Sequence, residues 1–472
     1  MKNAFFKLIK HPWLLLLLAA VGYVLLLTVP YISHKAVSES QKSQIETRTY
    51  YGDSTGTERA GYIDDNTEAL LYRLHLMEQA EHEIILSTFD FDVDEASKDI
   101  MASLLAAADR GVTVRILVDG FSGFLDVSPS PWFQALASHE RVTLKIYNPI
   151  RPLLPWKMQA RLHDKYLIVD DKMFLLGGRN TFNLFLGDYS AKKNIDRELF
   201  IYEKEQNPES ALFQLRSYFE SIWASKDSKT FTGHRSKKKV NACLAWLKEH
   251  PAKLRTMYPE AYQPWDYEAL TVPTSRVTLL SNSISSGNKE PWMWYTLHHL
   301  MQSGKHVTIY TPYIICGKEM YADLTSLCQP PRQVEIITND VASGANPWGC
   351  TDYLNEKEKI WATGARVYEY LGEHSSHTKA VLIDDRMSIV GSYNLDMRSA
   401  YQDTELMLAV DSPELNAIIR KEAERDKTFS RYMTEEGTYQ NGENYVPQEI
   451  SAGKKIFYQF FRTLVKPLRR FL

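Results

Sequence analysis

The chain starts with an uninterrupted apolar segment and continues with a long body in which short apolar runs alternate with amphipathic ones. Residues 13–32 contain no charged side chain. At a rise of about 1.5 Å per residue they would form a helix about 30 Å long, the thickness of the hydrocarbon core of a bilayer. A cleaved signal peptide is the alternative, but its apolar core has only about 7–15 residues and ends at a small-residue site. We therefore predict a basic segment at 1–12 and an uncleaved transmembrane anchor at 13–32.

In the body, strand-like apolar runs alternate with helical patterns, and their order repeats. The runs at 84–91 and 112–120 have counterparts at 307–313 and 334–340. This alternation predicts an α/β sheet in each half of the body. The expected boundaries are a linker at 33–60, a first domain at 61–225, a connecting segment at 226–272, a second domain at 273–428 and a tail at 429–472.

The end of the tail, residues 454–472, has a helical pattern of its own. Large apolar residues recur every three or four positions, and basic residues fall mostly between them. This pattern is typical of an amphipathic helix that lies in the interface of an anionic membrane. A helix that packs on the body through the same apolar face is the alternative.

The charge of the chain is unevenly distributed. The formal net charge is −3, but residues 1–10 hold three lysines and residues 454–472 hold six basic residues, without any acid. Removing these nine charges from −3 leaves a body at −12. An acidic body does not favour a nucleic-acid-binding surface, whereas basic ends favour a membrane. Positive charges before the anchor outnumber Lys35 and Lys42 just after it, which predicts a body outside the cytoplasm.

The cysteines restrict the classes of protein further. Cys243, Cys316, Cys328 and Cys350 form no CxxC pair, which excludes a zinc ribbon, and four cysteines are too few for a disulfide scaffold of this length. One or two disulfides in an extracytoplasmic body and buried free thiols remain as alternatives.

One motif occurs twice in the body. The first copy reads HDKYLIVD and continues to GGRN, and the second reads HTKAVLID and continues to GSYN. Five residue types recur at a single offset of 214, which far exceeds chance and indicates an internal repeat. The recurring polar residues are His163, Lys165, Asp170 and Asn180 in the first half and His377, Lys379, Asp384 and Asn394 in the second.

The spacing within the motif indicates its chemistry. Histidine and lysine stand two positions apart at the start of a strand, so both side chains point to one face. A lysine beside an imidazole suits an anion and repels a metal ion. The glycines that follow allow close approach of a ligand, and the asparagines add amide donors. The two aspartates end the first strand of a hairpin, and we expect them to brace it.

A carboxylate follows each copy, Glu198 in the first half and Glu405 in the second. A catalytic histidine needs one ring nitrogen held so that the other points to the substrate. Because a glutamate occurs at the corresponding place in both halves, we expect these two residues to orient the histidines. A surface carboxylate on an edge strand is the alternative.

The repeated HxKxxxxD signature with its GGxN or GSxN continuation resembles that of the phospholipase D superfamily, over roughly residues 60–425. The run GSYNLDMRS at 391–399 and the segment TPY at 311–313 resemble bacterial cardiolipin synthases. The single anchor, TND at 338–340 and the basic-apolar tail are most similar to the synthases that accept phosphatidylethanolamine as donor. The first copy lacks an equivalent of DxRS, and TPYII replaces the usual TPYFVP.

The resemblance implies two pseudo-symmetric phospholipase D-like α/β/α domains that share one cleft, in addition to the transmembrane helix. One histidine would attack the phosphodiester phosphorus and form a phosphohistidine, while the other protonates the leaving alkoxide and later deprotonates the incoming hydroxyl. Family precedent makes His163 the expected nucleophile and His377 the acid/base. Lysines would supply the positive charge, so no metal or other cofactor is expected. Tyr313, Arg398 and Ser399 either shape the cleft or only pack beside it.

The implied activity is phosphatidyl transfer that makes cardiolipin from phospholipids. The expected partners are phosphatidylglycerol, phosphatidylethanolamine as in the most similar synthases, and the membrane itself. The expected location is the cell membrane, with a single-pass anchor and an extracytoplasmic body. Hydrolysis of phospholipids by water is the alternative, and a membrane-tethered nuclease is disfavoured by the acidic body, so no nucleic acid is expected as a partner. A non-catalytic scaffold would tolerate replacement of His163 or His377.

Overall fold

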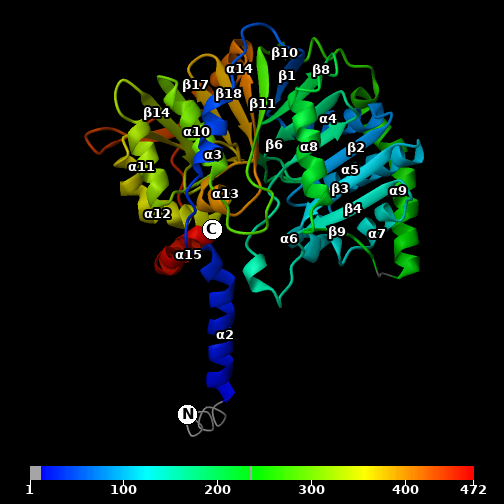
Figure 1. Cartoon of the computed structure of the whole chain (residues 1–472), viewed down its shortest axis with the longest axis horizontal. Coiled ribbons are helices and arrows are strands. Elements are labelled where there is room, and N and C mark those ends of the chain that lie inside the picture. Colours follow the sequence, from blue (N-terminus) through cyan, green and yellow to red (C-terminus); the bar gives the residue numbers. More distant parts are fainter. Residues whose placement is uncertain (1–11, 234–235) are drawn as a thin grey trace.

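The computed structural model describes residues 12–233 and 236–472. The apolar helix α2 (Pro12–Thr28) projects from one end of the body, and the short helix η1 (Val29–Tyr31) continues it (Figure 1). Within the described chain, Trp13–Tyr31 is the one helical segment with the length and hydropathy needed to span a membrane. Its side chains are mostly exposed, as suits a helix surrounded by lipid. The predicted anchor is thus a helix, while residues 1–11 of the predicted basic segment lie outside the described residues.

The first half of the body is built on a nine-stranded sheet with the order β10-β1-β8-β6-β5-β2-β3-β4-β9. Strands β2, β3 and β4 are parallel, and the strands from β1 to β5 in this order pair antiparallel. The strands are β1 (Glu58–Ile63), β2 (Glu83–Thr88), β3 (Thr113–Asp119), β4 (Val142–Tyr147), β5 (Tyr166–Val169), β6 (Met173–Gly177), β8 (Glu198–Glu203), β9 (Ser228–Thr230) and β10 (Val272–Pro273). The longer helices are α4 (Asn66–Gln79), α5 (Glu95–Asp109), α8 (Ala211–Ala224) and α9 (Lys237–Met257).

The second half repeats this architecture. The order β11-β20-β18-β17-β12-β14-β15 matches β1-β8-β6-β5-β2-β3-β4 strand for strand, and β21 and β22 extend the far edge. The strands are β11 (Arg276–Ser281), β12 (His306–Tyr310), β14 (Gln333–Asn339), β15 (Arg366–Tyr370), β17 (Ala380–Ile383), β18 (Met387–Gly391), β20 (Leu406–Asp411), β21 (Ser430–Met433) and β22 (Tyr439–Asn441). The longer helices are α10 (Trp292–Gln302), α11 (Lys318–Leu327), α12 (Pro347–Trp361) and α14 (Pro413–Thr428). The α/β fold of two similar halves is confirmed.

The two sheets pack together through a shared apolar core. Each half has an outer core between its sheet and its own helices. A third cluster joins the inner faces, with Ile85 and Leu117 from the first sheet and Leu279 and Leu408 from the second. The central strands are therefore covered on both faces, which explains why they read as continuous apolar runs. A short parallel pair, β7 (Asn194–Ile195) with β16 (Ser375–Ser376), also joins the halves.

Several expected boundaries differ from the structure. The connecting segment contains α9, and its apolar face, with Cys243, Leu247 and Leu254, is buried in the core of the first half. The tail contributes β21 and β22 to the second sheet, and the expected linker contains a helix, α3 (Glu39–Thr47). All four cysteines are free, and three of them are buried, which matches the free-thiol alternative.

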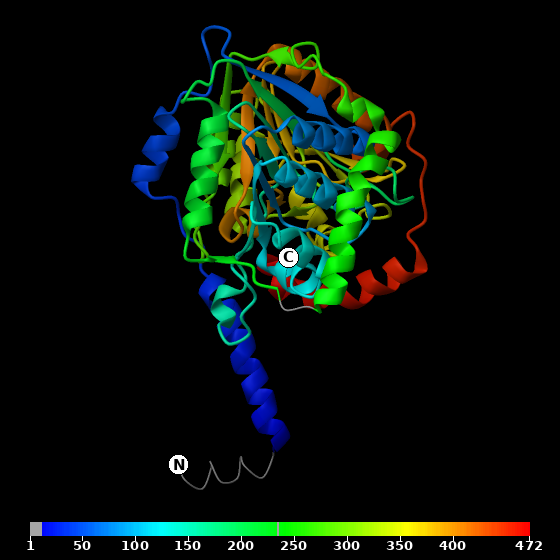
Figure 2. The same cartoon turned by 90° about the vertical axis from the view of Figure 1, so that its right-hand side faces the viewer.

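The tail ends in helix α15 (Ala452–Val465), followed by η5 (Lys466–Phe471), at the end of the body from which α2 projects (Figures 1 and 2). One face of α15 packs on α12, where Phe457 and Phe461 contact Trp348 edge-on. A second apolar strip, with Ile456 and Phe460, is exposed. The helix thus has one apolar face for the body and another that faces away from it.

Candidate active site

The two motif hairpins, β5–β6 and β17–β18, lie near the middle of their sheets. His163 and Lys165 come just before β5, and His377 and Lys379 just before β17. The charge of each lysine acts on both histidines and lowers the pKa of each imidazole. The four groups from two distant segments therefore belong to one site at the junction of the halves.

His163 is held by a carboxylate of the opposite half. Its Nδ1 lies 2.9 Å from Oε1 of Glu405. The Glu405 carboxylate in turn accepts hydrogen bonds from the hydroxyls of Ser392 and Ser399, the latter at 2.6 Å. Glu405 is completely buried, so these contacts fix the ring of His163 and leave its Nε2 as the free nitrogen. The structure thus places Glu405 beside a motif histidine, that of the other copy.

His377 is held in the same way by Asp196, a residue that sequence reasoning missed. Its Nδ1 lies 2.6 Å from Oδ2 of Asp196, which comes from the first half. The Nζ of Lys379 lies 3.5 Å from the same carboxylate oxygen. Both histidines are thus oriented by a carboxylate supplied by the opposite half.

The expectation that Glu198 orients a histidine is wrong. Its carboxylate forms a buried bidentate ion pair with Arg73 on α4, at 2.6 and 2.8 Å. Arg179 approaches the same carboxylate, with Nε 3.5 Å from Oε1. Glu198 therefore joins α4 to the sheet within the first half and does not reach either imidazole.

Strand register explains why Asp196 replaces Glu198. Gly177 of the first motif pairs with Glu198, and the equivalent Gly391 pairs with Met407. Two residues before these partners stand Asp196 and Glu405. The similar segments DRELF (196–200) and DTELM (403–407) suggest instead that Glu198 is equivalent to Glu405. That alignment is shifted by two positions from the one that strand pairing gives. The need for glycine at 178 is a second sign that Asp196 lies close to the motif, because a Cβ on Gly178 would lie 2.3 Å from the Asp196 carboxylate.

Burial and mutual repulsion set the charges of the site. Burial, together with Lys165 and Lys379, lowers the pKa of His163 well below its ordinary value and that of His377 to about 3. Burial also lowers the pKa of Lys165 to about 7 and that of Lys379 to about 8. The resting site therefore holds neutral imidazoles beside lysines whose positive charge has no solvent to stabilise it. Such a site gains most from an anionic ligand.

The two carboxylates differ in charge state. Burial would raise the pKa of Asp196, but Lys379 and His377 outweigh it and lower the pKa to about 2. Burial raises the pKa of Glu405 to about 8, although Lys165 and the two serine hydroxyls oppose this shift. The partner of His377, Asp196, is thus firmly ionised, and its negative charge favours a proton on the His377 ring. The partner of His163, Glu405, is less readily ionised and favours such a proton less.

The motif asparagines are both buried. Nδ2 of Asn394 donates to the hydroxyl of Tyr313 at 3.1 Å. The Oδ1 atoms of Asn180 and Asn394 are buried, and neither has a hydrogen-bond partner among the described residues. Both amides therefore keep unused hydrogen-bonding capacity inside the site.

Asp170 and Asp384 are placed at the hairpin turns, in the left-handed region with φ of 52° and 48°. The Asp170 carboxylate accepts hydrogen bonds from the backbone N–H groups at 81–83, between 2.8 and 3.0 Å. Asp384 accepts from the N–H groups of Lys305 and His306, each at 2.8 Å. Both carboxylates are therefore used to tie a hairpin turn to the start of the neighbouring strand, as expected of bracing residues, and a whole strand separates them from the histidines.

A cavity of about 810 Å³ opens onto His163. Its inner end is polar and includes Asn394, Arg161 and Arg398. Arg398 pairs with Asp403, with Nη2 3.1 Å from Oδ1, and Ser399 bonds Glu405, so both residues support the cleft. Tyr313 lines the cavity too.

A family model described as "Cardiolipin synthase, PLD-like domain" matches residues 74–223 and 296–427, which is more than half of the chain and includes both motifs. The chain belongs to this family. Within this PLD-like family the curated relatives include cardiolipin synthase C of Escherichia coli K12, which is 22% identical over 450 residues that cover 87% of this chain and 94% of the relative. Cardiolipin synthase B of Salmonella typhi is 25% identical over 350 residues, which cover 72% and 74% of the two chains.

The fold also matches a solved structure. Phosphatidylserine synthase of Haemophilus influenzae Rd KW20 aligns with a TM-score of 0.62 and 16% identity, over 92% of this chain and 99% of that chain. At this identity the match supports the PLD-like fold of two joined halves.

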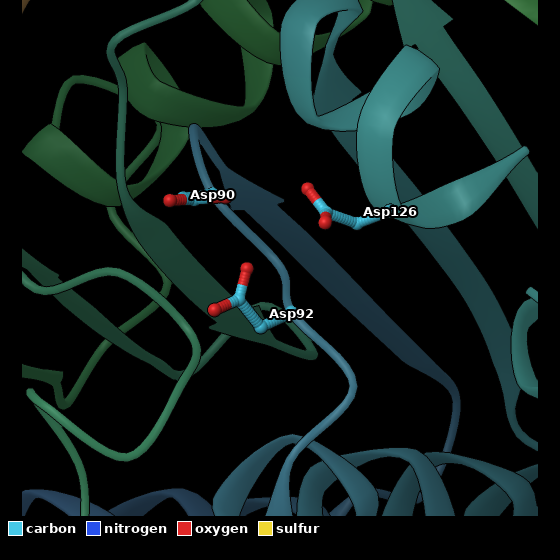
Figure 3. A group of neighbouring side chains, drawn as sticks. All are labelled: Asp90, Asp92 and Asp126. Carbon is cyan, nitrogen blue, oxygen red and sulfur yellow. The ribbon is translucent and has the colours of Figure 1, made fainter. Parts of the chain in front are cut away.

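Outside the histidine site, three carboxylates form an acidic group. Asp90 and Asp92 follow β2, and Asp126 faces them from the helical turn η2 (Gly123–Val127) (Figure 3). Burial and mutual repulsion raise the pKa of Asp90 to about 7 and that of Asp92 to about 6. Their oxygens are of the type that binds hard divalent cations, but such a group by itself does not define a metal site, and we assign it no role.

Proposed function

We propose that this protein is a membrane-anchored phosphatidyltransferase that makes cardiolipin from phospholipids through a phosphohistidine intermediate. One observation carries the proposal: two histidines from the two halves, each held at Nδ1 by a carboxylate of the opposite half, lie in one site with two buried lysines. Two oriented imidazoles suit a double displacement, in which one ring forms a bond to phosphorus and the other moves protons.

In the first step, Nε2 of His163 attacks the phosphorus of the donor lipid. The P–N bond forms as the P–O bond to the donor head group breaks, and His377 gives its proton to the leaving oxygen. In the second step, His377 takes a proton from the hydroxyl of the acceptor lipid, whose oxygen forms a new P–O bond as the P–N bond breaks. His163 returns to its free form, and two phosphatidyl groups share one glycerol.

The charges support this assignment of roles. The nucleophile must be neutral, and burial together with the two lysines lowers the pKa of His163 well below its ordinary value. The proton carrier must accept a proton, and His377 lies beside the ionised carboxylate of Asp196. A bound phosphodiester brings a negative charge next to the lysines and so raises the pKa of both rings, which allows His377 to hold a proton when the lipid is bound.

Lys165, Lys379, Asn180 and Asn394 would hold the phosphoryl oxygens. Lysines whose pKa is lowered by burial are restored to full charge by an anion, and that charge stabilises the pentacoordinate transition state. Rotation of the Asn394 amide would let Oδ1 accept from Tyr313 and turn Nδ2 toward the ligand. These groups supply positive charge and donors without a metal.

The membrane fits this substrate. α2 would hold the body at the bilayer, and the exposed apolar strip of α15 would lie in the interface at the same end of the molecule. The lysine distribution favours a body on the extracytoplasmic side.

Purified protein in mixed micelles tests the proposal. Labelled phosphatidylglycerol is supplied with and without phosphatidylethanolamine, and the products are separated by mass. Cardiolipin is the expected product, with glycerol or ethanolamine as the leaving group. Phosphatidic acid alone would identify a hydrolase instead, and cleavage of a single-stranded oligonucleotide with intact lipids would identify a nuclease.

A further inference from the structure

The cavity above His163 is polar at its inner end and apolar at its outer end. The outer wall includes Phe121, Phe124 and Leu125, which belong to the short helical segment 120–127 after β3. About half of each of these three side chains is exposed, at 50%, 57% and 50%. Exposed aromatic and aliphatic side chains next to one another mark a surface that meets something apolar.

The anchor helix forms part of the same wall. Leu27, in the last turn of α2, lines the cavity together with His163. The contact is not incidental, because Tyr23 of α2 donates from its hydroxyl to Sδ of Met158, another lining residue, at 3.6 Å. The hydroxyl of Tyr31 donates to the carbonyl of Trp156 at 3.0 Å. Two points along the anchor are therefore fixed to the segment that borders the cavity.

The position of Leu27 determines where the cavity opens. The membrane-spanning segment ends at Tyr31, so Leu27 lies within the apolar span, about 6 Å before its end at a rise of about 1.5 Å per residue. A cavity lined by both Leu27 and His163 thus reaches from the catalytic histidine to the depth where acyl chains begin. Its polarity changes along its length in the same order as that of a phospholipid.

We infer that this cavity is an acyl-chain site, which takes a chain of the reacting phospholipid directly from the bilayer with α2 as one wall. The inference rests on the proposed function and deepens it. The phosphodiester would lie at His163 while the first methylenes pass between Leu27 and Leu125 and the rest of the chain stays in the membrane. The anchor then selects and aligns the lipid, in addition to tethering the body.

Filling the cavity tests the inference. Leu27→Trp and Leu125→Trp add bulk to the cavity from two different elements, α2 and η2. Leu26→Trp and Leu153→Trp are matched controls at exposed positions that do not line the cavity. The full chain is assayed with dioleoyl- and with dihexanoyl-phosphatidylglycerol. We expect the two filling variants to lose about tenfold in kcat/KM with the long-chain lipid, the effect of roughly two lost methylene contacts. With the short-chain lipid they should match the wild type, and the controls should match it with both lipids.

A second readout separates this inference from the proposed function. Dioleoyl-phosphatidylglycerol retained by the purified protein is counted by native mass spectrometry, which needs no turnover. Lower retention by the two filling variants, with normal retention by the controls, supports the acyl-chain site even if no lipid is converted, an outcome that would overturn only the proposed function. Equal retention in all variants, or equal losses with both chain lengths, overturns the acyl-chain site and leaves the transfer activity in place.

Discussion

Nδ1 of His377 lies 2.6 Å from Oδ2 of Asp196, and the two residues belong to different halves of the molecule. The reciprocal pair, His163 with Glu405, crosses in the opposite direction at 2.9 Å. Neither half therefore contains an oriented histidine of its own. Docking of the two sheets through their shared core is what brings each histidine to its carboxylate, so one half alone lacks both contacts.

The first prediction concerns Asp196→Asn. The amide keeps the size of the side chain but removes the charge that holds the Nδ1–H tautomer of His377. We expect kcat to fall by about 10³–10⁴, as for the carboxylate of a catalytic triad, with a small change in KM. Steady-state kinetics with phosphatidylglycerol would measure this. A KM effect without a kcat effect would place Asp196 outside the proton path.

The second prediction concerns the residue two positions away. Glu198→Ala leaves the buried Arg73 and Arg179 without their carboxylate. Removal of one partner of a buried ion pair costs about 3–5 kcal/mol, so the variant should unfold at clearly lower temperature or denaturant concentration. Its kcat, measured where it is folded, should stay close to that of the wild type. A loss of kcat as large as that of Asp196→Asn would restore the orienting role to Glu198.

Much of this architecture follows from the sequence. The constant offset between the two motif copies predicts two similar halves, and the alternation of strands and helices predicts the α/β fold class of each half. The histidines and lysines of the motif meet in one site because each copy lies at the same place in an equivalent sheet. Glu405 could also be predicted to contact a histidine, because a catalytic histidine needs a group that holds one ring nitrogen and Glu405 is a carboxylate that follows the motif.

The pairing of partners could not be predicted from the chain alone. It depends on how the two halves face each other, and that is determined by burial of residues such as Leu117 and Leu279 between the sheets. Asp196 was missed because Glu198, in the segment DRELF, looks equivalent to Glu405. Strand pairing instead makes Asp196, two residues earlier, the equivalent of Glu405. The position of α9 could not be predicted either. An amphipathic pattern indicates that a helix packs on another element, but it does not indicate which element.

The third prediction is a bell-shaped pH profile of kcat/KM with its maximum near pH about 7.5. Lysines bind phosphate only when charged, and burial lowers the pKa of Lys165 to about 7 and of Lys379 to about 8, so affinity is lost as the pH rises. Burial raises the pKa of Glu405 to about 8, so its carboxylate is lost as the pH falls. Lys165 has the lower pKa and loses its charge first, so Lys165→Arg, which keeps the charge, should move the alkaline limb upward. A profile that stays flat toward pH about 10 would contradict the role of buried lysines.

The fourth prediction separates bracing from catalysis at Asp170. Asp170→Ala removes the acceptor of three backbone N–H groups and places alanine at φ 52°. We expect a loss of roughly 1–3 kcal/mol in the free energy of unfolding. Asp170→Asn should lose less, because asparagine tolerates this backbone conformation and still accepts a hydrogen bond. Neither variant should change KM, and a large fall in kcat with Asp170→Asn would instead indicate a chemical role.

The last prediction concerns the second apolar strip of α15. Ile456 and Phe460 are each 67% exposed although Phe457 and Phe461 already pack on α12. An exposed strip of large apolar side chains is typical of a helix that lies against an apolar phase, and the basic residues beside it favour anionic lipid. A polarity-sensitive dye at Phe460→Cys should show blue-shifted emission in proteoliposomes that contain anionic lipid. Ile418→Cys on α14, at the end of the body opposite α2 (Figure 1), provides the control and should stay in water. Identical emission at both positions would show that α15 does not enter the interface.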